Sequence, residues 1–313
     1  MKRPKILVVG SFVMDLIVTT EQFPSAGQTV LGNGFSTAPG GKGANQAIQA
    51  ARLGADVTMV GKVGNDDFGE KLIESAKTSG VNTDYVLKSE KFPSAVGNVQ
   101  VQSNESGTEN RIIVVPGANM DINPCEVAFL KEKISEYDMV ILQNEIPMEI
   151  NMLVAGYAKA KGVPVMLNPA PSAAIPDELI SCLTYISPNE HETKDIIGIN
   201  PTGEDKQNEA IEKFVKMGVD RVLITLGKHG CIFGDGKNLF KSDSVDCGNV
   251  IDPTAAGDSF IAAFCTAVAS NSPIEQALYF ANCTAGITVS RMGAQTSLPT
   301  LQEVTKIMES REN

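Results

Sequence analysis

The sequence contains no tryptophan, only two histidines and only six cysteines in 313 residues. The cysteines are widely spaced and form no Cys-x-x-Cys pair, which disfavours both a zinc site and a disulfide framework. Basic residues are also in short supply, with 26 Lys and Arg against 37 Asp and Glu and a net charge of −11. Because the basic residues are scattered, the composition indicates neither nucleic acid nor an anionic membrane as a partner.

Long apolar runs are missing too. The most apolar N-terminal stretch, residues 6–18, is interrupted by Gly10, Ser11 and Asp15 and is followed by no small-residue cleavage site. It therefore predicts a first strand rather than a signal peptide, and no stretch is long enough to span a membrane. We expect a cytoplasmic protein whose residues 1–313 bury a large core as one α/β domain.

Strand-like and helix-like segments alternate along the chain. Continuous apolar runs of β type occur at 5–10, 57–63, 139–143, 163–167, 184–187 and 222–225, and helical patterns occur at 66–78, 148–160, 204–217, 254–269, 273–290 and 301–310. This alternation predicts an α/β fold with a doubly wound, mostly parallel sheet and helices on both faces.

Two segments interrupt the alternation. Residues 15–36 and 94–115 are rich in Val, Thr, Gln and Asn in near-alternating order, which predicts half-exposed antiparallel strands with a polar turn at 102–110. They form either a small sheet beside a ligand site or a surface hairpin.

The segment from Asp252 to Asp258 reads Asp-Pro-Thr-Ala-Ala-Gly-Asp and leads directly into an apolar helix. Ala255, Ala256 and Gly257 have almost no side chain, so a phosphate can approach backbone N–H groups at the positive end of the helix dipole. Asp258 either supports the helix start or accepts a proton from an attacking hydroxyl.

A second glycine cluster lies at 39–45, Pro-Gly-Gly-Lys-Gly-Ala-Asn, before a helical pattern that ends at Gly54. Lys42 and Asn45 offer polar groups to a polyhydroxylated ligand on an open backbone. The spacing is not that of a phosphate-binding P-loop, because Gly43 follows Lys42 where Ser or Thr would hold magnesium. An ordinary turn is the alternative for this cluster alone.

Together the two clusters resemble the signature segments of the ribokinase family of sugar kinases, and the resemblance covers essentially the whole chain. Further matches follow in the expected order: Gly10-Ser11 with Asp15, Asn144-Glu145, Ser187-Pro188-Asn189-Glu190 with Glu192, Thr225-Leu226-Gly227, Ala281-Asn282, and residues 293–297. The resemblance implies transfer of the ATP γ-phosphoryl group to a primary sugar hydroxyl, foremost the 5-hydroxyl of D-ribose.

The resemblance also implies a role for each matched residue. Asp258 would be the base, with Ala255, Ala256 and Gly257 as backbone donors to the transferred group. The sugar would be held by Asp15, Gly41, Lys42, Asn45, Glu145 and Asp252. The nucleotide and Mg²⁺ would be bound near Asn189, Glu192, Thr225, Gly227 and Asn282, although Glu192 alone also fits a solvated helix-face carboxylate.

A K⁺ site is implied as well, mostly through backbone carbonyls, at Asp252, Thr254, Thr288, Arg291, Gly293 and Ser297. A hydrogen-bonded pair of loops is the plain alternative. The family resemblance further implies that segments 15–36 and 94–115 form a β-sheet lid over the sugar. Its exposed edge would suit a homodimer.

Two residues depart from the family pattern. Val13 stands where ribokinases commonly have Asn, and Gly97 stands where Ala is expected in the lid. The loss of an amide at 13 weakens the assignment of the sugar, because one polar contact can set selectivity. A kinase for deoxyribose, another pentose, fructose or a nucleoside therefore stays open, as does a non-catalytic sugar-binding protein.

Overall fold

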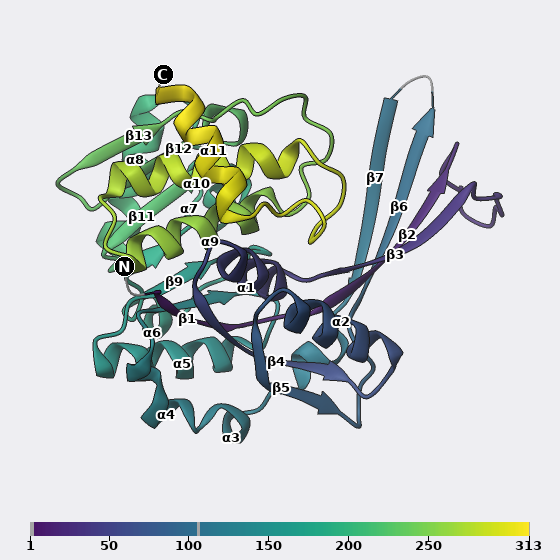
Figure 1. The fold of residues 1–313 in the computed structure, drawn as a ribbon, viewed down its shortest axis with the longest axis horizontal. Helices are drawn as coiled ribbons and strands as arrows, with labels where there is room; N and C mark the ends of the chain where they lie inside the picture. Colours follow the sequence, from purple (N-terminus) through teal and green to yellow (C-terminus); the bar gives the residue numbers. More distant parts are fainter. Residues whose placement is uncertain (1–2, 105–106, 313) are drawn as a thin grey trace.

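The computed structural model describes residues 3–104 and 107–312, which form a layered α/β body and a smaller sheet that projects from it (Figure 1). The body contains a nine-stranded sheet in the order β13-β12-β11-β10-β9-β8-β1-β4-β5. Its strands are β1 (Lys5–Val9), β4 (Asp56–Gly64), β5 (Asn82–Ser89), β8 (Met139–Gln143), β9 (Val165–Asn168), β10 (Tyr185–Ile186), β11 (Arg221–Thr225), β12 (Cys231–Gly234) and β13 (Leu239–Ser242). All neighbours are parallel except β11–β12 and β12–β13. The predicted doubly wound, mostly parallel sheet is confirmed.

Helices cover both faces of this sheet. They are α1 (Lys42–Arg52), α2 (Asp67–Thr78), α3 (Pro124–Val127), α4 (Leu130–Lys133), α5 (Met148–Lys161), α6 (Asp177–Ile180), α7 (Glu190–Ile197), α8 (Glu204–Met217), α9 (Ala256–Ala269), α10 (Ile274–Val289) and α11 (Leu301–Glu312). Strand β1 shows why two cores result: Ile6 and Val8 are buried in one cluster, whereas Leu7 and Val9 are buried in the other. Alternate side chains of a central parallel strand point to opposite faces, so both faces must be apolar.

The projecting sheet has four strands in the order β3-β2-β6-β7, namely β2 (Val13–Thr20), β3 (Gly34–Gly40), β6 (Val96–Asn104) and β7 (Gly107–Val115). Strands β2 and β6 are parallel, and the two outer pairs are antiparallel. The expected small sheet is therefore present, but the prediction of antiparallel strands is wrong for its central pair, because β2 and β6 come from separate segments that run in the same direction. Strand β3 of this sheet continues without a break into the glycine cluster at 39–45. Part of the predicted polar turn, residues 105–106, lies outside the described residues.

The sequence pattern does not predict β5, β12 or β13. Strands β5 and β13 are the two edges of the main sheet, and β12 lies next to β13. Their apolar signal is weak, because β5 carries polar residues at many positions and β12 and β13 have four residues each. The helix expected from Thr254 begins two residues later, because Ala255 has a left-handed φ of 61°. Gly54 does end α1 with a φ of 94°, as predicted.

Candidate active site

The candidate residues gather where parallel strands end and two helices begin. Ser11 follows β1, Glu145 follows β8, Asn189 follows β10 and Thr225 ends β11. Helices α1 and α9 start at the same edge of the sheet and pack against each other near the centre of the molecule (Figure 1). The carboxyl edge of a doubly wound sheet is where such folds bind ligands, because the loops that follow the strands converge there.

Asp258 is buried in the first turn of α9. Its Oδ2 accepts a hydrogen bond from Asn45 Nδ2 at 2.9 Å, and its Oδ1 accepts one from Gln46 Nε2 at 3.0 Å. Each carboxylate oxygen has a second lone pair, so both contacts leave room for a proton from a ligand. The two glycine-rich segments of the sequence therefore meet directly at this carboxylate.

The turn before α9 offers backbone donors beside Asp258. Ala255 is the N-cap in a left-handed conformation, and Ala256 N–H donates to Pro253 O at 3.2 Å because residues 253–256 form a turn. Within the described chain, the N–H groups of Ala255 and Gly257 have no acceptor. Of the three expected donors, two are thus free for an anion and Ala256 is engaged locally.

Glu145 links the first strand to the glycine cluster. Its Oε2 accepts hydrogen bonds from Ser11 Oγ at 2.5 Å and from Lys42 N at 3.0 Å. Ser11 Oγ in turn accepts from Gly43 N at 3.2 Å. A Cβ on Gly43 would lie 2.4 Å from Ser11 N, so only glycine allows these two segments to come this close.

Asp15 lies in β2 between two glycines of neighbouring strands. A Cβ on Gly40 would lie 2.9 Å from its Oδ2, and a Cβ on Gly97 would lie 2.3 Å from its Oδ1. Burial, and secondarily the negative charge of Glu145, raise the pKa of Asp15 to about 6. Val13 is buried beside it, with Cγ1 3.7 Å from the Cβ position of Gly97.

Lys42 faces three carboxylates. Burial lowers its pKa, but the attraction of Asp258, Glu145 and Glu192 outweighs burial and raises the pKa above the ordinary value. The ammonium group therefore stays charged and offsets the negative groups of the site, a useful property where an anionic ligand must bind among carboxylates.

On the expected nucleotide side, Asn189 and Glu192 form a capping box at the start of α7. Glu192 N donates to Asn189 Oδ1 at 2.8 Å, and Asn189 N donates to Glu192 Oε2 at 2.9 Å. Burial raises the pKa of Glu192, more than its backbone hydrogen bond from Asn189 and the charge of Lys42 lower it. Glu192 is thus a half-buried group facing Lys42, not a solvated helix-face carboxylate.

Thr225, Gly227 and Asn282 lie farther along the same edge. Thr225 forms a parallel bridge with Asn189, and Gly227 follows it in a short 3-10 turn with a φ of 52°. Asn282 of α10 donates to Ser242 Oγ at 3.0 Å, which ties this helix to β13.

The residues expected at the cation site lie in two loops that are joined directly. Asp252 Oδ2 accepts from Gly293 N at 2.8 Å, and its Oδ1 accepts from Thr254 N at 2.9 Å. Although burial raises the pKa of Asp252, these hydrogen bonds lower it below its usual value. Three other side chains are committed elsewhere: Thr288 donates to Thr284 O, Arg291 pairs with Glu303 and Ser297 donates to Ala294 O.

Three buried amides were not among the predicted site residues. Gln46 bonds Asp258, Gln143 bonds Gln46, and Asn168 accepts from Gln46. Their signal in the sequence is faint, because a glutamine inside an apolar helix or at the end of an apolar strand looks like any polar substitution. Only their convergence in space distinguishes them.

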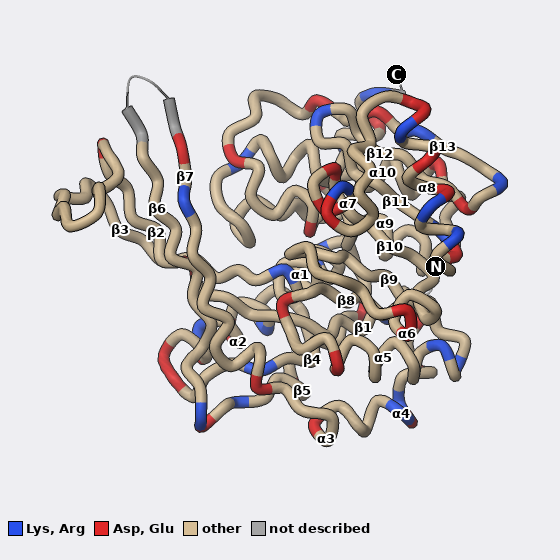
Figure 2. Tube along the Cα trace, turned by 180° about the vertical axis from the view of Figure 1, so that it is seen from behind, with Lys and Arg blue, Asp and Glu red and all other residues tan. Residues whose placement is uncertain are grey.

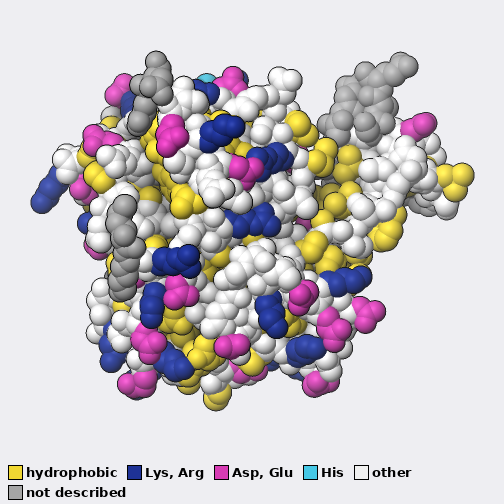
Figure 3. Space-filling model, viewed as in Figure 1, with side chains coloured by type: hydrophobic (Ala, Val, Ile, Leu, Met, Phe, Trp, Pro, Cys, Tyr) yellow, Lys and Arg dark blue, Asp and Glu magenta, His cyan; other side chains and the backbone are white. Residues whose placement is uncertain are grey.

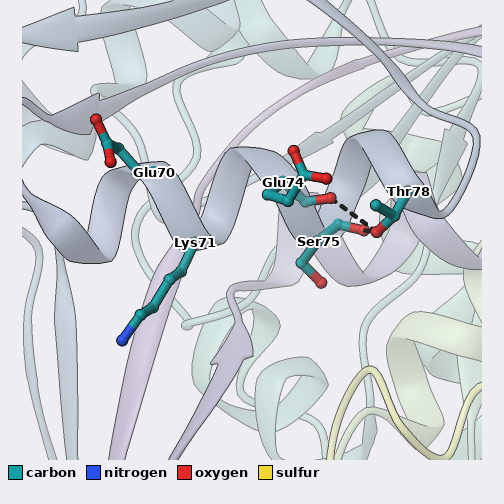
Figure 4. A pocket seen from close by; sticks show the side chains of 5 residues that line it. All are labelled: Glu70, Lys71, Glu74, Ser75 and Thr78. Carbon is teal, nitrogen blue, oxygen red and sulfur yellow. Dashed lines mark hydrogen bonds between the residues drawn. The ribbon is translucent and has the colours of Figure 1, made fainter.

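One surface depression on the body lies away from these groups. It runs along α2 between Glu70, Lys71, Glu74, Ser75 and Thr78, and its side chains splay outward along the helix (Figure 4). It includes none of the residues around Asp258, so the convergent polar groups rather than this hollow identify the candidate active site.

Comparison with known proteins decides the family. The sequence pattern of the pfkB family carbohydrate kinases matches residues 3–301. This chain belongs to that family. It is 41% identical over 305 residues to a ribokinase of Bacillus subtilis, covering 97% of this chain and 99% of the relative. It is 30% identical over 308 residues to a deoxyribokinase of Salmonella typhi, covering 98% and 99%.

The fold agrees with a solved family member. The structure of Arabidopsis thaliana ribokinase complexed with ribose and ATP superposes with a TM-score of 0.91 at 33% identity, covering 98% of this chain and 99% of that one. As a pfkB-family member the protein is an ATP-dependent carbohydrate kinase, a class in which Mg²⁺ accompanies ATP. Within the described residues, none of the helices is both long and apolar enough to cross a membrane.

Proposed function

We propose that this kinase transfers the γ-phosphoryl group of ATP to the 5-hydroxyl of D-ribose, giving ribose 5-phosphate and ADP. The observation that carries the proposal is the buried Asp258 carboxylate, which accepts a hydrogen bond from Asn45 of the glycine cluster at 39–45 and lies beside the free N–H groups of Ala255 and Gly257. A sugar bound at Asn45 and a phosphate bound at the start of α9 then meet at one carboxylate.

In this reaction the hydroxyl oxygen bonds to the γ-phosphorus while the bond from phosphorus to the β–γ bridging oxygen breaks. Asp258 accepts the hydroxyl proton, and ADP leaves with the bridging oxygen. The N–H groups of Ala255 and Gly257 stabilise charge on the transferred group, the term on which phosphoryl transfer mostly depends. The positive charge of Lys42 offsets the carboxylates that would otherwise repel the transferred phosphoryl group. Ala256, expected as a third donor, supports the turn through its bond to Pro253.

The sugar would lie between the glycine cluster and the lid. Asn45 Oδ1 is buried without a hydrogen-bond partner among the described residues, so a sugar hydroxyl would complete its bonding. We also assign Asp15, Glu145, Lys42 and the backbone of Gly41 to sugar binding. The assignment is supported by the hydrogen bond from Lys42 N to Glu145 and by the effect of the Glu145 charge on Asp15. Asp252 differs from these residues because both of its carboxylate oxygens already accept hydrogen bonds, from Thr254 and Gly293. It would bind the sugar only through its remaining lone pairs.

We place MgATP along the edge formed by Asn189, Glu192, Thr225, Gly227 and Asn282. The described residues contain no cluster of three His, Cys, Asp or Glu side chains suited to a metal. The donor set therefore fits an ion held mainly by ATP phosphates and water, as Mg²⁺ prefers, with Glu192 and Asn189 acting through water.

We further propose a K⁺ ion between the loops at 252–254 and 288–297. Because Thr288, Arg291 and Ser297 have committed side chains, the ligands would be Asp252 and backbone carbonyl oxygens, a donor set that suits potassium. Replacing sodium by potassium at constant ionic strength should raise activity several-fold, a difference that screening cannot produce. Equal rates in the two salts would leave Asp252 as a simple tie between loops.

The lid would also join two copies into a homodimer. Strand β7 is a sheet edge with four consecutive apolar side chains, Ile112 to Val115, each exposed by 50% or more. Hydrophobic side chains are visible over this sheet in Figure 3, whereas most charged residues lie on the helices and loops of the body (Figure 2). All six cysteines are free thiols, which supports a cytoplasmic location.

A second candidate substrate is 2-deoxyribose. It is favoured by Val13, which presents a buried apolar side chain beside Asp15. A sugar hydroxyl that faces Val13 would have no hydrogen-bond partner there. The site would therefore favour ribose over 2-deoxyribose less strongly than a site with Asn at this position.

The test is a phosphorylation assay with MgATP across ribose, 2-deoxyribose, fructose and adenosine. We expect the highest kcat/KM with ribose, and the Asp258→Asn variant should lose at least about 100-fold in kcat because its amide cannot take a proton. A preference for 2-deoxyribose would select the second candidate. Turnover of no sugar at all would contradict the proposed function.

A further inference from the structure

The carboxylate of Asp258 is held from α1 by a buried chain of amides. Gln46 Nε2 donates to Asp258 Oδ1 at 3.0 Å and to Asn168 Oδ1 at 3.1 Å, while Gln46 Oε1 accepts from Gln143 Nε2 at 2.7 Å. Gln46 and Gln143 are both 0% exposed. Asn168 Nδ2 donates onward to Ser187 O at 3.1 Å. The chain thus connects three neighbouring strand ends, β8, β9 and the residue after β10, to the head of α9.

The orientation of the Gln46 amide is fixed by this chain. If the amide were flipped, its oxygen would face Asp258 Oδ1 and Asn168 Oδ1, and its NH₂ group would face the Gln143 donor. Acceptors would then oppose acceptors and a donor would oppose a donor, so only one orientation satisfies all three contacts. A buried amide in the wrong orientation leaves polar groups unsatisfied and is therefore disfavoured.

From this geometry we propose that Gln46 is a positioning residue that sets the rotamer of the Asp258 carboxylate for proton transfer, and that Gln143 and Asn168 fix Gln46 in turn. The proposal rests on the proposed role of Asp258 as base. Asn45 fixes the other oxygen but also has an unpartnered atom for the sugar, whereas every polar atom of Gln46 bonds protein. Gln46 should therefore affect the chemical step without affecting sugar binding.

Gln49, which lies one turn after Gln46 on α1, offers a matched control. Gln49 is also 0% exposed, and its Nε2 donates to Pro299 O at 2.9 Å, away from Asp258. Methionine has nearly the volume of glutamine but no amide, so Gln46→Met and Gln49→Met have a similar packing cost. Gln46→Met removes three buried hydrogen bonds, whereas Gln49→Met removes one together with an Oε1 atom that has no partner among the described residues. Thermal unfolding of both variants measures that cost directly.

We expect Gln46→Met to lower kcat about 10- to 100-fold, the order of effect that a small misplacement of a reacting group produces, with KM for sugar and ATP changed less than about twofold. Gln49→Met should keep the wild-type kcat. Gln46→Glu should be worse than Gln46→Met, because a carboxylate would replace a donor beside Asp258, whose negative charge already acts on Glu192.

A double-mutant cycle separates positioning from a general loss of structure. In an Asp258→Asn background, Gln46→Met should cause little further loss in kcat, because the group that it positions no longer acts. The proposal would be overturned if the fold-losses in kcat of the two single variants multiplied in the double variant. It would also be overturned if Gln46→Met and Gln49→Met lost kcat equally. If Asp258→Asn itself keeps wild-type kcat, the proposed base is wrong; if only Gln46→Met keeps it, the proposed base stands and the positioning role falls.

Discussion

The lack of a side chain at Gly97 determines where the carboxylate of Asp15 can lie. Asp15 is the only charged residue in β2, β3 and β6, and its Oδ1 lies 2.3 Å from where a Gly97 Cβ would be. The carboxylate fits between its two neighbouring strands only because Gly40 and Gly97 lack side chains. The departure of this chain from the family pattern at 97 is therefore coupled to the placement of the Asp15 carboxylate, which we assign to sugar binding.

Gly97→Ala should displace the Asp15 carboxylate and raise the sugar KM by about 10- to 100-fold, since a hydrogen bond to a charged group contributes about 1.5–3 kcal/mol. The ATP KM should not change. Gly156→Ala in α5 is the control, because no atom lies within 4 Å of its Cβ position. Steady-state kinetics with both substrates checks this, and an unchanged sugar KM in Gly97→Ala would refute the coupling.

The raised pKa of Asp15, about 6, predicts a pH dependence of sugar binding. The ionised carboxylate accepts stronger hydrogen bonds from hydroxyls than the protonated acid does, so the sugar KM should rise as pH falls from about 7 to 5. The folded protein binds this proton more tightly than the unfolded chain, so the same protonation should increase stability as pH falls from about 6 towards 3.8. In Asp15→Asn both dependences should flatten, as measured by kinetics and thermal unfolding across this range.

At the element scale, the start of α9 holds a strained residue. Ala255 has a φ of 61°, a left-handed conformation that costs an L-residue roughly 1–2 kcal/mol. The N–H groups of Ala255 and Gly257 have no acceptor among the described residues, so this turn leaves two donors at the start of the helix. A local helix signal in the sequence cannot report the strain, so the helix was expected from Thr254.

Ala255→Gly should relieve this strain and stabilise the protein by up to about 1 kcal/mol, after the greater freedom of glycine in the unfolded chain is subtracted. Asn271→Gly is the matched comparison: Asn271 follows α9 with a φ of 64°, and asparagine tolerates this region better than alanine. Denaturant unfolding should show the larger gain at 255. A gain at 271 equal to or above that at 255 would contradict the strain argument.

At the scale of the whole molecule, the lid carries an apolar surface that one chain leaves exposed. Ile113 is 65% and Phe35 is 70% exposed, on the two edge strands β7 and β3. Exposed apolar edge strands are sites of pairing unless another chain covers them. A second copy would cover this surface and hold both lids in place over their sugars.

Wild-type protein should therefore sediment at twice the 33.2 kDa chain mass. Ile113→Lys should shift it to the monomer and raise the sugar KM, because an unsupported lid closes less often. Leu239→Lys, at a residue 41% exposed on the outer strand of the main sheet, should remain dimeric. Wild-type monomers at the assay concentration would remove the dimer from the proposal.

The sequence by itself determined the fold class, the two glycine-rich segments and the kinase family, because these depend on local signals: apolar runs, small residues before a helix, and motif spacing along the chain. The tertiary structure alone decided how the segments meet. Gln46 and Asp258 are separated by 212 positions, and only the packing of α1 against α9 brings their side chains together. The same holds for Asp15 between Gly40 and Gly97. Side-chain contacts across elements are fixed by close packing rather than by neighbours in the chain, and so they leave no periodic pattern in the sequence.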